Sequence, residues 1–227
     1  MFPLPTARVT AIAALDDAQT ALSLLDLAQA RLGSRLTGFE LFSDLCLALV
    51  LKHFPTCVAP FAKRHAQYAL IEISDLESEA AARGSLESML GEALEKDLIL
   101  DAAISQSLAQ FKAMWALRDN VSEAQAHEGP NIKHDVTVPI SRMAEFITVT
   151  DAAGLAAEAV PDGLALAVLM GGAFDLETAG GHAPDEIGGE LAVQRIHGGF
   201  LLDGAGGEPR LAPDLARPER LIEVQDL

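Results

Sequence analysis

Three polar side chains whose chemistry could combine lie in the stretch "WALRDNVSEAQAHEGPNIKHDVTVP", residues 115–139. Arg118 and Ser122 are four residues apart in a segment with helical spacing, so they are predicted to share one helix face. Lys133 lies on the next predicted strand, where alternation turns it to the face opposite His134, which we interpret as structural rather than as a base. A guanidinium, a hydroxyl and an ammonium that converge would bind a carboxylate well. The alternative is a solvated helix face plus an unrelated strand lysine, and spacing alone favours that alternative.

The charge balance restricts the partners that such a site could serve. The 227 residues carry 33 Asp and Glu against 16 Lys and Arg, a formal net charge of −17. This charge argues against nucleic acid and against anionic membrane surfaces, because both repel a protein of that sign. An anionic small molecule would need a local cationic pocket. The longest apolar run, residues 163–174, has 12 residues and is too short to span a bilayer as a helix.

The two cysteines, Cys46 and Cys57, form no CxxC pair and no His/Cys metal cluster in the sequence. We interpret them as core thiols, which suits a reducing compartment. The opening "MFPLPTARV" has neither the basic nor the apolar region of a signal peptide, so we expect a cytoplasmic protein. The sequence contains no HExxH and no GxSxG, which leaves metal-hydrolase and serine-nucleophile chemistry without a motif.

The first 150 residues alternate predicted strands and helices. Apolar periodicity and turn residues predict strands at 8–15, 35–42, 68–74, 98–105 and 132–139. Helical spacing predicts helices at 18–32, 45–54, 86–97 and 106–125, and a last helix that Ser141 caps. The result is a sheet with helices packed on it, α/β or α+β. Alternation by itself favours a parallel doubly wound sheet, but no phosphate-binding glycine loop follows any of these strands.

The composition changes near residue 150. Residues 151–227 contain no Lys, Ser, Asn, Cys, Tyr or Trp, and they hold 13 of the 18 glycines and 14 acids against 4 arginines. The segment 202–221 is typical of a loop, and 188–202 could hold two short strands. We therefore predict one domain at 1–150 and a Gly/Pro/acid-rich tail of unknown fold at 151–227.

Four stretches of the first part resemble the FAD-linked oxidase family of D-2-hydroxy-acid dehydrogenases. They are "LTGFELFSDLCLALVLKH", "YALIEISD", the "LR…SEA" helix end at 117–124 and "IKHDVTVPISRMAEFI", in the family's order. The family includes D-lactate dehydrogenases, D-2-hydroxyglutarate dehydrogenase and the large subunit of glycolate oxidase. The resemblance covers most of residues 1–150 and concerns the family's C-terminal substrate-capping domain alone.

This resemblance implies an α+β fold, an antiparallel sheet with helices packed on it, followed here by an irregular tail. It implies the oxidation of a D-2-hydroxy acid to a 2-oxo acid with FAD as hydride acceptor, and in some members a divalent metal. It also implies that Arg118, Ser122 and Lys133 hold the substrate carboxylate.

Two departures from the family pattern shape the functional expectation. The start of the chain resembles the start of the capping domain, so a flavin-binding domain is not expected within it. The family's HxGDGNxH segment, which brings metal ligands and the catalytic histidine, has no counterpart in 151–227, and we interpret His182 and His197 as solvated loop residues. We therefore expect a part of an oxidoreductase that contributes the substrate clamp and is inactive alone. One explanation for such a part is a gene with a late start and a frameshift near codon 150. The alternatives are a subunit that meets a separate flavin-binding chain, and a non-catalytic anion-binding module.

Overall fold

The first sheet is antiparallel throughout and places the N-terminal strand in its interior. A computed structural model describes residues 7–128, 131–158, 166–169, 174–175 and 193–202. Strands β1 (Ala7–Leu15), β2 (Leu36–Ser43), β3 (Gln67–Asp75) and β4 (Asp101–Ile104) are ordered β2-β3-β1-β4. Every pair in it is antiparallel. The antiparallel sheet is confirmed, and the parallel arrangement that alternation alone favours is wrong.

Helices α1 (Ala18–Leu32) and α3 (Glu79–Glu95) cover one face of this sheet. Alternate residues of β1, such as Val9, Ala11 and Ala13, point into the core between them and are at most 1% exposed. Helix α1 begins where the sequence predicted, because the Asp17 carboxylate accepts a hydrogen bond from the Thr20 amide at 2.7 Å. It ends at Gly33, whose φ of 55° suits glycine, and the short 3-10 turn η1 (Gly33–Arg35) leads into β2.

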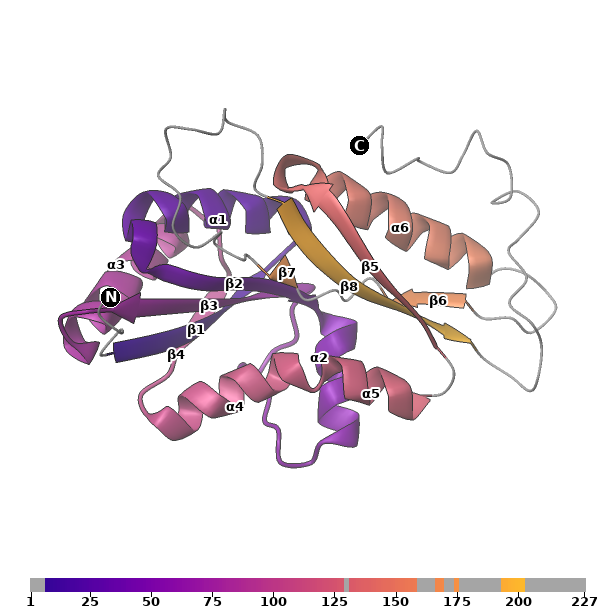
Figure 1. Cartoon of the computed structure of the whole chain (residues 1–227), viewed down its shortest axis with the longest axis horizontal. Coiled ribbons are helices and arrows are strands. Elements are labelled where there is room, and N and C mark those ends of the chain that lie inside the picture. The colour runs from indigo at the N-terminus through magenta and orange to yellow at the C-terminus, as the bar shows by residue number, and fades with distance from the viewer. Residues whose placement is uncertain (1–6, 129–130, 159–165, 170–173, 176–192, 203–227) are drawn as a thin grey trace, which may run out of the picture.

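Helices α2 (Asp44–His53), α4 (Leu108–Asp119) and α5 (Val121–Glu128) lie against the opposite face (Figure 1). A second apolar core fills the space below the sheet, built from side chains of β1, β2, β3 and these helices: Ile12, Phe42, Cys46, Leu47, Leu49, Val50, Tyr68, Leu70, Leu117, Val121 and Ala124. This face also carries buried polar groups, among them Thr10, Glu40 and Glu72. These polar groups face α4, the helix that carries Arg118.

Two predicted elements differ from the observed ones. The helix predicted at 106–125 is two helices, α4 and α5, which meet at Asn120. The strand predicted at 98–105 is shortened to β4, because residues 96–100 form the turn after α3. In both places local periodicity was right about the type of element, and turn geometry decided where it stops.

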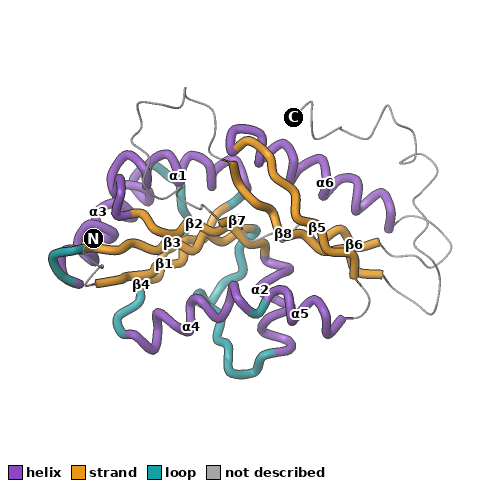
Figure 2. The backbone as a smooth tube through the Cα atoms, in the orientation of Figure 1, coloured by secondary structure: helices purple, strands orange, loops and turns teal. Residues whose placement is uncertain are grey.

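A second sheet follows in the chain. Its order is β5-β8-β6, with β7 beside β8, and all of its pairs are antiparallel. Its strands are β5 (Asn131–Pro139), β6 (Leu166–Leu169), β7 (Phe174–Asp175) and β8 (Val193–Leu202). The turn η2 (Ile140–Arg142) and helix α6 (Met143–Glu158) follow β5, and α6 packs against α1. Figure 2 shows β5 and β8 side by side, beyond the first sheet.

The second sheet includes residues that were predicted to lie in the tail, so several predictions for the tail can be compared with it. The boundary predicted at residue 150 falls inside α6. The two short strands expected within 188–202 are one ten-residue strand, β8. His197 is a residue of that strand, in register with Asp135, and the loop position expected for it is wrong. His182 lies outside the described residues.

Candidate functional site

Arg118 lies in the last turn of α4 and is held by a carboxylate from the sheet. Its Nε donates to an Oε2 oxygen of Glu40 in β2, and its Nη1 lies 3.7 Å from the Asp119 carboxylate. The Arg118 side chain is 20% exposed and that of Glu40 is 6% exposed. The guanidinium therefore remains accessible at the end of α4 while its direction is fixed from below.

Glu40 reaches this position because of strand alternation in "GFELF". It shares a face with Phe42, which is 1% exposed in the core below the sheet. A carboxylate buried on an apolar face is costly unless a cation and hydrogen bonds compensate it. Arg118 is that cation. Glu40 is not among the residues predicted from the sequence, although a charged residue on the buried face of an apolar strand is a signal for such a partner.

Ser122 lies in the first turn of α5, just beyond the junction with α4, and is exposed. The helical path continues through Asn120, whose amide donates to Ala116 at 3.2 Å and whose carbonyl accepts from Ala124 at 2.8 Å. Arg118 and Ser122 therefore remain about one helical turn apart although the helix is assigned in two parts.

Lys133 lies on β5, in register with Gly199 of β8, and its side chain is outside the described residues. Helix α5 contacts β8, so β5 is one strand away from the helix that carries Ser122. The elements that hold the three predicted residues are neighbours in space. The convergence of Arg118, Ser122 and Lys133 on one ligand stays a prediction.

The far end of α5 is fastened to α2. Lys52 Nζ lies 2.6 Å from the Glu128 carboxylate, which His53 also contacts, and the rings of His53 and His127 stack with centroids 5.1 Å apart. The hydrogen bond from Lys52, followed by that from His53, lowers the pKa of Glu128 below its ordinary value. These contacts fix the position of α5 and hence of Ser122.

The two thiols lie in different environments. Cys46 is fully buried in α2, and burial raises the pKa of its thiol to about 11. Cys57 is half-buried, and the Asn120 side-chain amide contacts its sulfur at 3.6 Å. Within the residues that the structure describes, no group of three or more His, Cys, Asp or Glu side chains is arranged to hold a metal ion.

Three cavities are lined entirely by described residues. The first, of about 590 Å³, lies between α4 and the sheet and includes Trp115 and Glu72. The second, of about 480 Å³, includes Ser107, and the third, of about 320 Å³, includes Tyr68. No glycine lines any of these three cavities, whereas a dinucleotide pyrophosphate is typically held by the backbone of a glycine-rich turn. The three described cavities therefore have no glycine-rich turn of the kind that typically holds a dinucleotide.

A comparison with known protein families shows the family to which the chain belongs. The family model described as "FAD linked oxidases, C-terminal domain" matches residues 4–172. The chain belongs to this family. The family match continues past the boundary predicted at residue 150, through α6 and β6.

Curated relatives of this FAD-linked oxidase chain are named D-2-hydroxyglutarate dehydrogenase. The protein from Xanthomonas citri pv. viticola is 40% identical over 130 residues, which are 56% of this chain and 26% of the relative. The mitochondrial protein from Arabidopsis thaliana is 30% identical over 137 residues, 60% of this chain and 24% of the relative. The match thus spans about a quarter of the length of these relatives.

A solved structure of alkyldihydroxyacetonephosphate synthase aligns with 88% of this chain and 36% of its own, with a TM-score of 0.49 and 9% sequence identity. This likeness is too weak to bear on function. No helix among the described residues combines the length and the apolar character needed to cross a membrane.

Proposed function

We propose that this chain provides the carboxylate-binding part of an FAD-dependent oxidoreductase that oxidises a D-2-hydroxy acid to a 2-oxo acid. The observation that carries the proposal is Arg118 at the end of α4, accessible yet fixed by Glu40, in a chain whose relatives are named D-2-hydroxyglutarate dehydrogenase. In the reaction the flavin would supply the hydride acceptor. The residues of this chain would bind and orient the acid.

Each of the three residues has a distinct part in holding the carboxylate. Arg118 offers a planar fork that can pair both carboxylate oxygens, whereas Lys133 offers a point charge. Ser122 adds a neutral donor one helical turn from Arg118. The position of the carboxylate in turn orients the hydroxyl-bearing carbon of the substrate. The proposed order of importance is Arg118 ≥ Lys133 > Ser122.

The test is a calorimetric titration of D-2-hydroxyglutarate against the purified chain and its variants, with and without added FAD. Loss of Arg118 or of Lys133 should each cost about 1.5–3 kcal/mol of binding free energy, since a charged hydrogen bond is lost. Ser122→Ala should cost about 0.5–1.5 kcal/mol and Ser122→Thr very little, because the hydroxyl is kept. Arg118→Lys should still weaken binding, because it keeps the charge but loses the fork.

The same titrations distinguish the alternatives. D-2-hydroxyglutarate that binds without FAD or any partner would favour a non-catalytic anion-binding module. Dehydrogenase activity that appears only when a flavin-binding chain is added would favour a subunit of a larger enzyme. Equal binding of the acid by the parent and by Arg118→Ala would refute the role given to Arg118.

A further inference from the structure

The first and second cavities share Arg8, Phe111 and Lys112, so they form one continuous groove along α4. We call it the α4 groove. Arg8 comes from β1, whereas Phe111 and Lys112 come from α4, so the groove lies between two separate elements. Neither Arg118 nor Ser122 lines it. We propose that the α4 groove is a second ligand site, which binds a small organic anion with a flat, unsaturated or aromatic body.

The charges along the groove are the first argument. The chain has 33 acidic residues against 16 basic ones, so a cation that finds no acidic partner is unusual in it. Among the described side chains, three Lys or Arg residues form no ion pair: Arg8, Lys63 and Lys112. Two of these three, Arg8 and Lys112, lie in the α4 groove. They line the groove from different elements, which suits a ligand with an anionic head.

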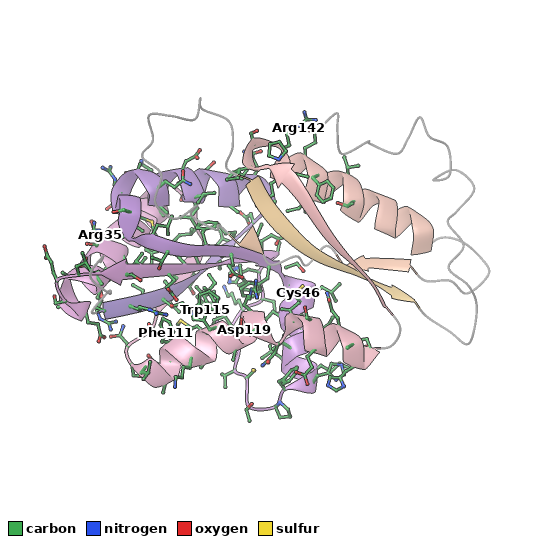
Figure 3. All side chains as sticks on the ribbon, in the orientation of Figure 1. Arg35, Cys46, Phe111, Trp115, Asp119 and Arg142 are labelled. Carbon is green, nitrogen blue, oxygen red and sulfur yellow. The ribbon has the colours of Figure 1, made fainter. Side chains whose placement is uncertain are left out.

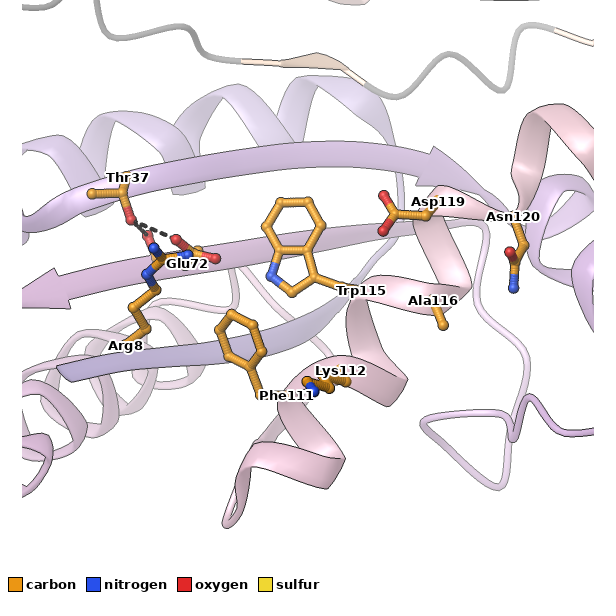
Figure 4. Close-up of a pocket in the computed structure, with 9 residues that line it drawn as sticks. All are labelled: Arg8, Thr37, Glu72, Phe111, Lys112, Trp115, Ala116, Asp119 and Asn120. Carbon is orange, nitrogen blue, oxygen red and sulfur yellow. Dashed lines mark hydrogen bonds between the residues drawn. The ribbon is translucent and has the colours of Figure 1, made fainter.

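The aromatic wall is the second argument. Phe111 and Trp115 lie between α4 and the sheet, where Figures 3 and 4 show them. Trp115 is fixed in place, because its indole N–H donates to the Thr10 hydroxyl at 3.2 Å. Its ring also lies over Gly38, where an added Cβ would come within 3.6 Å of it. A fixed aromatic surface beside two cations suits a flat ligand body better than an aliphatic one.

The carboxylates of the groove determine where the anionic head can lie. Glu72 is only 9% exposed and accepts a hydrogen bond from the Thr37 hydroxyl at 3.0 Å, so it belongs to the floor. Asp119 lines the first cavity, and Figure 4 shows it at the opposite end from Arg8, with the aromatic rings between them. In the second cavity Glu79 is paired with Arg83 at 2.8 Å. The head therefore lies in the shared segment, and the body extends along Trp115.

The size of the groove agrees with a ligand of this kind. Its two parts measure about 590 and 480 Å³, within the range of about 300–1,000 Å³ that is usual for small-molecule sites. The site is thus large enough for a ring with a carboxylate or phosphate attached.

Trp115 is the only tryptophan of the chain, so its fluorescence reports on the α4 groove directly. Phenyl phosphate is the probe, with inorganic phosphate and benzyl alcohol as partial probes that lack the ring or the charge. We expect a saturable change in Trp115 emission with phenyl phosphate, and at least about tenfold weaker binding of each partial probe. Arg8→Gln and Lys112→Gln should each weaken binding about tenfold. Lys63→Gln, which removes the third unpaired cation at a different cavity, should leave binding unchanged.

Circular dichroism and thermal unfolding would establish that each variant is folded as the parent is. Because Arg8 and Lys112 are exposed and form no ion pair, their replacement should leave stability intact. Absence of saturation up to about 10 mM phenyl phosphate would overturn the proposal, as would equal weakening by Lys63→Gln. D-2-hydroxyglutarate should not displace the probe, and Arg118→Lys should not affect it. If the carboxylate-binding role of Arg118 is refuted, the test of the α4 groove is unaffected. If the α4 groove binds no phenyl phosphate, the test of Arg118 is likewise unaffected.

Discussion

The buried pair of Arg118 and Glu40 makes a quantitative test of how the site is built. In Arg118→Met the Glu40 carboxylate, 6% exposed, loses a guanidinium that helps to compensate its burial. Breaking a buried pair on one side typically costs about 3–5 kcal/mol, and the 20% exposure of Arg118 places the expected loss near the lower end, about 3 kcal/mol. At about 2–4 °C per kcal/mol for a domain of this size, the melting temperature should fall by about 6–12 °C.

The double variant Glu40→Leu/Arg118→Met separates charge burial from packing. Replacing a buried pair by apolar side chains of similar volume is often close to neutral, so the double variant should lie within about 1 kcal/mol of the parent. It should bind D-2-hydroxyglutarate about 1.5–3 kcal/mol more weakly than the parent, as expected for loss of Arg118, because the fork is gone. Urea unfolding followed by circular dichroism gives the free energies. The control is Arg142→Met, which removes an ion pair whose two side chains are 40% and 55% exposed and which should change little. A loss below about 0.5 kcal/mol in Arg118→Met would refute the reasoning, because the pair would then behave as a surface salt bridge.

Three further predictions concern other parts of the fold. Gly38→Ala should destabilise the chain by about 1 kcal/mol in urea unfolding, because its Cβ would lie 3.2 Å from that of Glu72, whereas Gly91→Ala in α3, where nothing lies within 4 Å, should stabilise it by about 0.5–1 kcal/mol. At pH 8 a thiol reagent should modify Cys57 quickly and Cys46 only on unfolding, because burial raises the pKa of Cys46 to about 11. Hydrogen bonds, chiefly from an arginine of α1, lower the pKa of Glu92 from 4.5 to about 2. Its stabilisation is therefore complete above pH 4.5 and is lost as the pH falls toward 2, so acid titrations of parent and Glu92→Gln should converge there.

The parts of the fold that local chemistry decides were predictable from the sequence. The cap at Asp17 and the stop at Gly33 follow from side-chain oxygens and backbone freedom, and the structure has both. The family resemblance corrected the direction of the strands, which periodicity does not determine, because strand and helix alternation is the same for parallel sheets and for split βαβ arrangements. The break at Asn120 was not predictable, since its backbone stays in the helical region and its hydrogen bonds nearly continue the helix.

The candidate site was predictable in type more than in detail. The sequence predicts Arg118 as a ligand-binding cation, and that role stays a prediction, but it does not predict the partner Glu40, which comes from a strand that lies 78 residues earlier in the chain. Pairing of this kind depends on which face of the sheet receives α4, and no local pattern carries that information. The α4 groove is a further example, because Arg8 and Lys112 are about a hundred residues apart in the chain and line one cavity only in the folded structure.

The order of strands in the first sheet also has a consequence for synthesis on the ribosome. β1 is made first, yet its two partners are β3, which begins at Gln67, and β4, which begins at Asp101. Roughly fifty residues separate the end of β1 from the start of β3. At a synthesis rate of about 5–20 residues per second, the apolar "AIAAL" segment of β1 therefore waits several seconds for its first hydrogen-bonding partner. During that time α1 on one face, and then α2 on the other, are the helices already made that can cover it. The nascent chain should therefore recruit a chaperone at this segment until β3 emerges, and a slower ribosome should lengthen that contact.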